Sequence, residues 1–191
     1  QQQPHLKIEL VEMTTLQQVK ALKEGRIDVG FGRLRISDPA LNRLLLREER
    51  LMMAVHSSHP LAVHKKGVYL ADLADETIFL YPNNVTPSFA THVQNLFAEY
   101  NLEPENLKHV REIQLALGLV AAGEGICIVP ESTQTIQLAH LNYIPILDET
   151  AISAIFMTFR NLDESEDIRS LIDCIYQVYD LEAFKYDRTF I

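Results

Sequence analysis

The hydrophobic positions of the chain switch repeatedly between a period of two and a helical period. Short apolar or alternating runs predict strands, and longer runs with apolar residues three and four apart predict helices between them. Strands are predicted over residues 6–11, 27–31, 41–47, 51–56, 78–81, 107–110, 126–129, 143–146 and 154–159. Helices are predicted over residues 15–24, 89–100, 113–122 and 165–179, with a short helical piece at 70–73. This alternation predicts an α/β fold with a parallel-rich sheet.

Capping residues mark the ends of several predicted helices. Thr14 or Thr15 begins the first helix, and Ser88 after Pro87 begins the second, because hydroxyl side chains satisfy the unpaired N–H groups of a first turn. Gly25 ends the first helix, since glycine readily adopts the left-handed backbone that stops a helix. A helix, a glycine and then a short apolar strand are typical of an α/β crossover unit.

Length and charge set outer limits on function. The 191 residues suffice for one large domain or two small lobes, and 47% of them are hydrophobic, so a sizeable core can form. A formal net charge of −9 argues against nucleic-acid binding by this piece alone. No secretion signal is visible, and the most apolar stretch, residues 115–129, is too short to span a membrane. We therefore expect a cytoplasmic domain.

Enzyme chemistry finds little support. The seven histidines lack metal-ligand spacing, and no serine lies in a Gly-x-Ser-x-Gly context. Gly123-Glu-Gly125 follows a helix rather than a strand, so it is not a dinucleotide fingerprint. Cys127 and Cys174 lie far apart in apolar runs, which favours buried free thiols over a disulfide. The sequence predicts neither a catalytic site, nor a metal, nor a cofactor.

Helix N-termini are the first candidate binding groups, because their N–H groups and positive dipole end favour carboxylates. Thr15 and Ser88 each open a helix after a predicted strand, and Glu112-Ile113 forms a third such junction. If the first two lie in different lobes, they face one cleft that suits a small dicarboxylate, with Phe89 and Ile113 beside its carbon chain. The alternative is that Thr15 and Ser88 are plain N-caps.

Two arginines form a second candidate site. Arg33 and Arg47 both follow apolar strands, and Glu48 and Glu49 are close in sequence. Salt bridges to these glutamates are one interpretation. The other is an anion pocket lined by Phe31, Leu46 and Tyr179, in which the planar guanidinium of Arg47 binds a carboxylate. In the absence of ligand, Glu49 or Glu48 would then partner Arg47.

Three segments resemble a known family. Residues 21–33, with Gly-Arg-Ile-Asp-Val-Gly-Phe at their centre, and the block Gly-Leu-Val-Ala-Ala-Gly-Glu-Gly-Ile-Cys-Ile-Val-Pro at 118–130 resemble the effector-binding domain of LysR-type transcriptional regulators. Residues 48–62 look like that family's crossing from first to second lobe. Residues 30–34, 80–82 with 87–89, and 111–125 are similar to the branch that regulates aromatic-compound breakdown.

The resemblance implies two Rossmann-like lobes of the periplasmic-binding-protein type II kind. Lobe I is expected at residues 1–48 plus 154–191 and lobe II at 49–153, with crossings at 46–54 and 152–155. The implied function is effector sensing in a transcriptional activator that forms a homo-oligomer, a dimer or tetramer. By this resemblance the chain is a fragment lacking the first strand and helix of the domain and the DNA-binding domain, so DNA would be contacted only through that absent part.

The resemblance also implies effectors and their ligands. Related regulators bind cis,cis-muconate in the cleft and benzoate in the second pocket. The ligand-binding positions carried over are Thr15, Phe31, Arg33, Leu46, Arg47, Glu49, Pro87, Ser88, Phe89, Glu112, Ile113, Ile155 and Tyr179. Two alternatives share the fold: a solute-binding protein of a transporter, and a prephenate-dehydratase-like enzyme, whose Thr-Arg-Phe segment the chain lacks.

Overall fold

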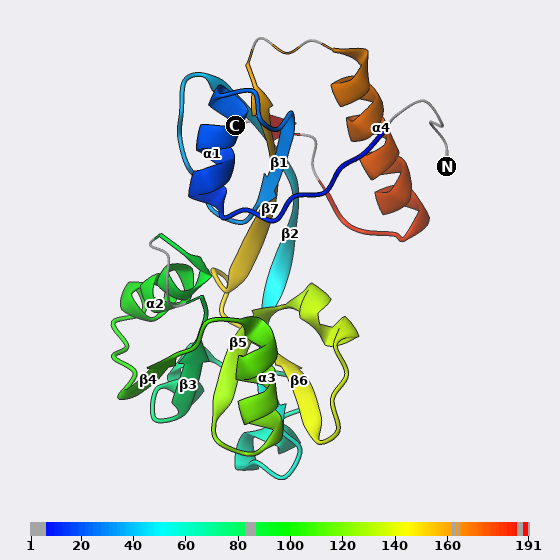
Figure 1. Ribbon diagram of the computed structural model, residues 1–191. Coiled ribbons are helices and arrows are strands. Elements are labelled where there is room, and N and C mark those ends of the chain that lie inside the picture. The colour runs from blue at the N-terminus through cyan, green and yellow to red at the C-terminus, as the bar shows by residue number, and fades with distance from the viewer. Residues whose placement is uncertain (1–6, 83–86, 162, 164, 187–188, 191) are drawn as a thin grey trace. The chain divides into compact units, whose positions relative to one another are not determined.

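The chain divides into two compact units. The computed structural model describes residues 7–82, 87–161, 163, 165–186 and 189–190. Unit 1 comprises residues 1–48 and 154–191, and unit 2 comprises residues 49–153. The chain passes from one unit to the other within strand β2 (Leu41–His56) and returns within strand β7 (Ile152–Arg160) (Figure 1).

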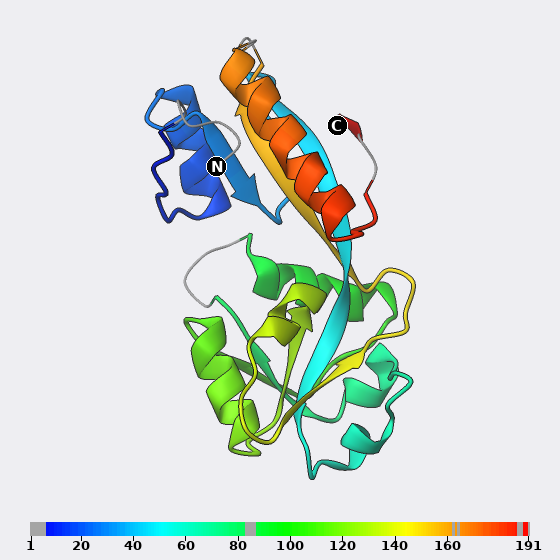
Figure 2. The ribbon, with the colours of Figure 1, turned by 90° about the vertical axis from the view of Figure 1, so that its right-hand side faces the viewer.

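Unit 1 is a small antiparallel sheet with two helices. Its other elements are α1 (Thr15–Lys23), β1 (Val29–Gly32), α4 (Glu166–Leu181) and β8 (Thr189–Phe190). Strand β7 lies between β1 and β2, and β8 pairs with β2. Helix α4 runs along β7 and β2 (Figure 2) and packs on them through one apolar cluster. The buried members of that cluster are Leu44, Leu46, Met157, Phe159, Ile168 and Tyr176.

Helix α1 forms as the sequence predicts. Thr14 is its N-cap, and Thr14 and Gln17 form a reciprocal capping box. Gly25 follows the helix with a φ of +69°, a conformation that glycine adopts without steric cost. Ala21 and Leu22 are fully buried on the inner face, so a short helix of modest intrinsic propensity is stabilised by packing.

Unit 2 is a mixed sheet covered on two faces. Besides the second half of β2 it contains β3 (Thr77–Leu80), α2 (Phe89–Glu99), β4 (Asn106–His109), α3 (Ile113–Ala121), β5 (Ile126–Pro130), β6 (Leu141–Pro145) and three 3-10 turns at Pro60–Val63, Leu70–Leu73 and Glu131–Thr135. The strand order is β4-β3-β5-β2-β6. Strand β3 is parallel to β4 and β5, whereas β2 is antiparallel to β5 and β6.

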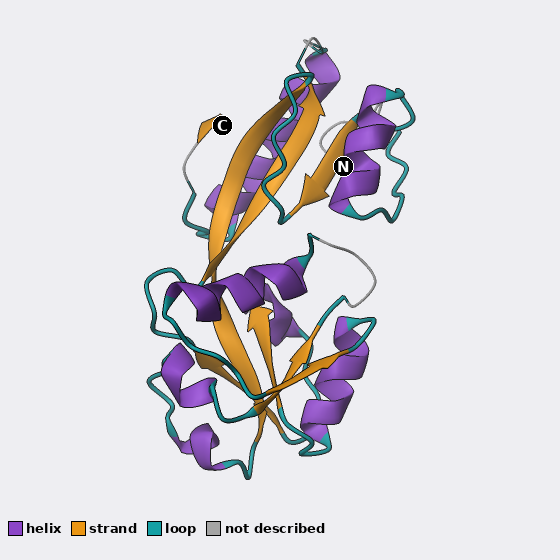
Figure 3. Ribbon diagram, turned by 90° about the vertical axis from the view of Figure 1, so that its left-hand side faces the viewer, coloured by secondary structure: helices purple, strands orange, loops and turns teal. Residues whose placement is uncertain are grey.

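Strand β5 shows why its sequence is apolar throughout. Ile126 and Ile128 belong to the cluster that packs on α2, and Cys127 and Val129 belong to the cluster that packs on α3. Figure 3 shows helices on both sides of this sheet. A strand buried on both faces has no polar side, so it appears in the sequence as a continuous apolar run.

Three expectations from the sequence are wrong. Residues 7–11 form no strand, and Ile8 and Leu10 are 70% and 91% exposed; Leu6 lies outside the described residues. An alternating pattern becomes a strand only beside a hydrogen-bonding neighbour, and the described strands supply none here. The predicted strands 41–47 and 51–56 are one strand, and most strand pairs are antiparallel rather than parallel.

The expected helices are confirmed, and their ends lie within two residues of the predicted ones. The absence of a disulfide between Cys127 and Cys174 is also as expected. Cys127 is buried, as expected, but Cys174 is only half-buried, because it lies on a flank of amphipathic α4. None of the described helices combines the length and apolar composition that crossing a bilayer requires.

Candidate functional site

The N-terminus of α1 meets the end of β1 within unit 1. The Thr15 hydroxyl lies so close to Gly32 that a Cβ on that glycine would be 2.8 Å from Thr15 Oγ1. Gln18 donates to the Phe31 carbonyl oxygen at 2.8 Å, which fixes the strand end against the helix. Arg33, half-buried, follows directly. A helix N-terminus, a hydroxyl and a guanidinium therefore come from one corner of this unit, which is chemistry suited to an anion.

The predicted pocket around Arg47 is assembled in part. Leu46, Ile155 and Tyr179 belong to the same apolar cluster. The Arg47 guanidinium carbon lies 5.3 Å from the centroid of the Tyr179 ring. The Phe31 side chain is 47% exposed and is not part of this cluster. Three of the four residues predicted for this pocket, Leu46, Arg47 and Tyr179, thus meet.

Sequence reasoning missed the aromatic side chains that surround this arginine. Phe184 lies under the Arg47 guanidinium at 4.0 Å, nearer than Tyr179. Tyr176 and Tyr186 stack at 4.7 Å, and both rings contact Tyr179. The dense run of aromatic residues between 176 and 186 was the sequence signal that could have indicated these aromatic surroundings of Arg47. Cation–π contacts stabilise a guanidinium while leaving its in-plane donors directed elsewhere.

In unit 2 the start of α2 is the main candidate group. Ser88 is 5% exposed and caps the helix, with its Oγ accepting from Thr91 N at 3.3 Å and its own N–H donating to Thr91 Oγ1 at 3.2 Å. The Phe89 ring packs 5.3 Å from Tyr81. The Ser88 hydroxyl can cap and still donate its proton, because a hydroxyl is both acceptor and donor.

The other predicted residues of unit 2 are less closely associated. Pro87 is exposed and precedes the Ser88 cap. Glu112 is the N-cap of α3 but makes no side-chain capping bond, and Ile113 packs on the α3 cluster. Glu49 is 4% exposed and accepts a hydrogen bond from Ser132 Oγ at 3.0 Å. A serine partner for this carboxylate was not anticipated from the sequence.

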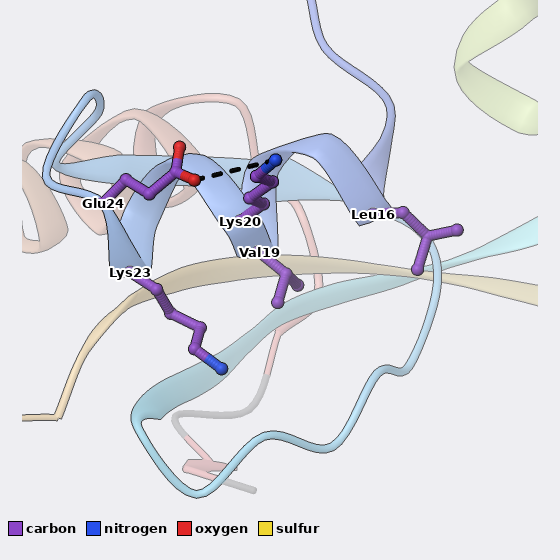
Figure 4. Close-up of a pocket in the computed structure, with 5 residues that line it drawn as sticks. All are labelled: Leu16, Val19, Lys20, Lys23 and Glu24. Atoms are coloured by element: carbon purple, nitrogen blue, oxygen red, sulfur yellow. Dashed lines mark ion pairs between the residues drawn. The ribbon is translucent and has the colours of Figure 1, made fainter.

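The pockets found within the units do not contain the predicted residues. In unit 1 an open pocket of about 330 Å³ runs along α1 and is lined by Leu16, Val19, Lys20, Lys23 and Glu24 (Figure 4). Its lysines are paired with carboxylates, Lys20 with Glu24 at 3.8 Å and Lys23 with Asp38 at 2.9 Å. We assign this pocket no function, because its charge is already compensated locally.

Nucleophilic and metal chemistry are not supported by the described residues. Burial raises the pKa of the Cys127 thiol, so the reactive thiolate is suppressed. The described part of the chain contains no cluster of three or more histidine, cysteine or carboxylate side chains that could hold a metal ion. What the two units do present is hydroxyls, helix N-termini, arginine and aromatic rings, which is the chemistry of carboxylate recognition.

Comparison with known proteins assigns the class. Residues 1–180 match the LysR substrate binding domain, and the chain therefore belongs to this family. Its fold is the family's mixed α/β, periplasmic-binding-protein type II-like fold. The expected narrower branch is confirmed as well: the chain is 60% identical to the HTH-type transcriptional regulator BenM of Acinetobacter baylyi over 96% of its length and 42% identical to CatR of Pseudomonas putida over 92%.

Solved structures agree with this assignment. The BenM effector binding domain with its effector benzoate is 58% identical, with a TM-score of 0.94 over 97% of this chain and 84% of that one. Full-length BenM matches with a TM-score of 0.93 over 97% of this chain and 62% of that one. The chain spans 61% and 60% of the lengths of BenM and CatR. These relatives are transcriptional regulators, so the solute-binding and enzyme alternatives are not favoured.

Proposed function

We propose that this chain is the effector-sensing part of a LysR-type transcriptional activator and that its effectors are small carboxylates. The observation that carries the proposal is the setting of Arg47, whose guanidinium lies 4.0 Å from Phe184 and 5.3 Å from Tyr179 beside buried Leu46. A cationic fork among aromatic rings suits an aromatic monocarboxylate. The likeness to a BenM domain solved with benzoate supports the same ligand class.

We also propose that the N-termini of helices α1 and α2 bind carboxylates. In unit 1 Thr15 lies against Gly32 and next to Arg33, and in unit 2 Ser88 opens α2 with Phe89 beside it. Each group supplies a hydroxyl proton and first-turn N–H groups, which bind a carboxylate oxygen. We propose cis,cis-muconate, a dicarboxylate, as an effector of this class. We propose supporting roles for Glu49, Pro87, Glu112, Ile113, Ile155 and Phe31.

The role of the whole regulator follows from the same proposal. A ligand changes a conformational equilibrium only through unequal affinity for the two states. We propose that carboxylate binding biases the domain toward the form that activates transcription in a homo-oligomer. DNA would be contacted by the part of the regulator outside this chain, in agreement with its net charge of −9, and the protein would act in the cytoplasm.

Calorimetric titration tests the two sites separately. We expect Arg47→Met to weaken benzoate binding and Ser88→Ala to weaken muconate binding by about 1–2 kcal/mol, the contribution of one hydrogen bond to a charged group. The control for Ser88 is Ser58→Ala, because Ser58 is exposed and, within the described part of the chain, forms hydrogen bonds only with His56. The control for Arg47 is Arg169→Met, an exposed arginine on α4.

The outcomes are separable. Benzoate affinity that is unchanged in Arg47→Met removes this arginine from the pocket, whatever muconate does. Failure of the unmodified domain to bind either carboxylate contradicts the proposed function itself. Because Ser88→Ala also removes a helix cap, its unfolding midpoint is measured alongside, and Ser88→Thr should restore both stability and affinity.

A further inference from the structure

Arg43 is a buried arginine whose hydrogen-bonding groups are not satisfied. Its side chain is 8% exposed, and Nε and Nη1 are both buried without an acceptor among the described residues. Buried polar groups in native proteins nearly always have a partner, since an unpaired donor loses its hydration without replacement. Its guanidinium carbon also lies 5.4 Å from the centroid of the Phe156 ring.

The electrostatic surroundings of Arg43 are positive. Burial and then the neighbouring charge of Arg35 lower the pKa of Arg43, and no carboxylate contributes in the opposite direction. A ring face attracts a cation but accepts no in-plane hydrogen bond, so Phe156 compensates only part of the cost. Two like charges thus lie close together with no acid among the described residues to balance them.

Arg160 provides an internal comparison in the same sheet. It donates to two backbone carbonyls and to the carboxylates of Asp28 and Asp163, and the Asp28 bond chiefly raises its pKa. The fold of unit 1 can therefore surround an arginine with acceptors. Among the described residues, none accepts a hydrogen bond from Arg43 Nε or Nη1, which leaves room for an acceptor from outside this part of the chain.

The location of Arg43 defines what could reach it. Leu44 and Leu46 face the cluster under α4, so the alternation of a strand places Arg43 on the opposite face of β2. Arg35 is exposed, whereas Arg43 is nearly covered. A solvent anion can therefore reach Arg35 directly, whereas only a small group could reach the nearly covered Arg43.

We propose that Arg43 and Arg35 form an oxyanion site in unit 1, separate from the carboxylate groups described above, with Arg43 as the main donor. The ligand class is a small oxyanion, of the size of phosphate or of a single carboxylate. A guanidinium fits such ligands because its planar N–H groups match two oxygens at once. Binding would replace the missing acceptors and compensate two positive charges together.

Inorganic phosphate at constant ionic strength is the probe. We expect phosphate to raise the thermal unfolding midpoint of the domain in a saturable manner. Arg43→Met should raise the dissociation constant for phosphate at least tenfold, and Arg35→Met should raise it severalfold. Ser88→Ala and the exposed control Arg169→Met should retain the response of the unmodified domain. Without phosphate, Arg43→Met should be at least as stable as the unmodified protein, because it removes an uncompensated buried charge.

A second readout reports on the residue directly. In protein labelled with ¹⁵N-arginine, the Nε–H signal of Arg43 should shift on phosphate addition, and muconate should not cause the same shift. The proposal is overturned if the unmodified domain shows no saturable response. It is also overturned if Arg43→Met keeps that response, or if Ser88→Ala abolishes it instead. The proposed effector sites would stand in each of these cases.

Discussion

Replacing Arg160 by methionine should loosen the attachment of α1 to the sheet of unit 1. Arg160 Nη1 donates to the carbonyl oxygens of Leu22 at 3.3 Å and Ile27 at 2.8 Å, at the C-terminal end of α1 and just beyond it. Nη2 donates to Asp28 at 2.8 Å and Asp163 at 2.9 Å. The guanidinium therefore adds a donor to the Leu22 carbonyl, which also accepts from Gly25 N, and it lies at the negative end of the helix dipole.

The expected cost follows from the burial of each partner. Each carbonyl bond contributes about 1 kcal/mol, below the usual ~1.5–3 kcal/mol for charged donors, because the Arg160 side chain is 30% exposed. The Asp163 pair adds roughly 0.5 kcal/mol. Asp28 adds almost nothing, since its side chain is 80% exposed. We expect Arg160→Met to lower the free energy of unfolding by about 2–3 kcal/mol.

Urea unfolding and amide hydrogen exchange together measure this change. Exchange of α1 amides should accelerate in Arg160→Met, while α2 amides in unit 2 provide the internal reference and Arg169→Met the control variant. The pKa of Asp163 is lowered below its ordinary 3.8, chiefly because the Ser165 side chain donates to its carboxylate. Burial acts in the opposite direction, and the bonds from Ser165 N–H and Arg160 lower the pKa further. The contribution of the Asp163 carboxylate to the free energy of unfolding should be fully present above pH 3.8 and should fade as the pH falls through the lowered pKa. This pH dependence should be absent in Asp163→Asn. Unchanged α1 exchange in Arg160→Met would refute the reasoning.

Two further predictions concern unit 2 and the thiols. Gly125→Ala should lower the free energy of unfolding by about 1–3 kcal/mol in the urea assay, because an added Cβ would lie 2.4 Å from Thr77 O. Gly118→Ala, in helix α3, should raise that free energy by roughly 0.5–1 kcal/mol, because an added Cβ there would have no atom within 4 Å. Thiol labelling of the native protein should modify half-buried Cys174 first, whereas Cys127, buried and with a raised pKa, should react only as fast as the domain unfolds. Equal labelling rates would contradict that order.

Local sequence determined the helices and their ends. Thr14, Gly25 and Ser88 act on the backbone of their own neighbourhood, so their capping roles can be recognised without knowing the rest of the fold. The apolar pattern of residues 113–129 likewise predicted a helix that ends at Gly123 and a buried strand after it, and the structure contains both. In the candidate site, the same local reasoning identified Ser88 and the start of α1.

Tertiary structure decided whatever depended on a partner far along the chain. The alternating pattern of residues 7–11 could not reveal that no described strand lies beside it, and Glu48-Glu-Arg could not reveal that β2 continues through it. Arginines show this most clearly. Only the fold surrounds Arg160 with four acceptors, stacks Arg47 on Phe184 and buries Arg43 beside the Phe156 ring with no acceptor for its Nε among the described residues. A guanidinium is charged at any neutral pH, so its role is set by the groups that folding brings within reach of it.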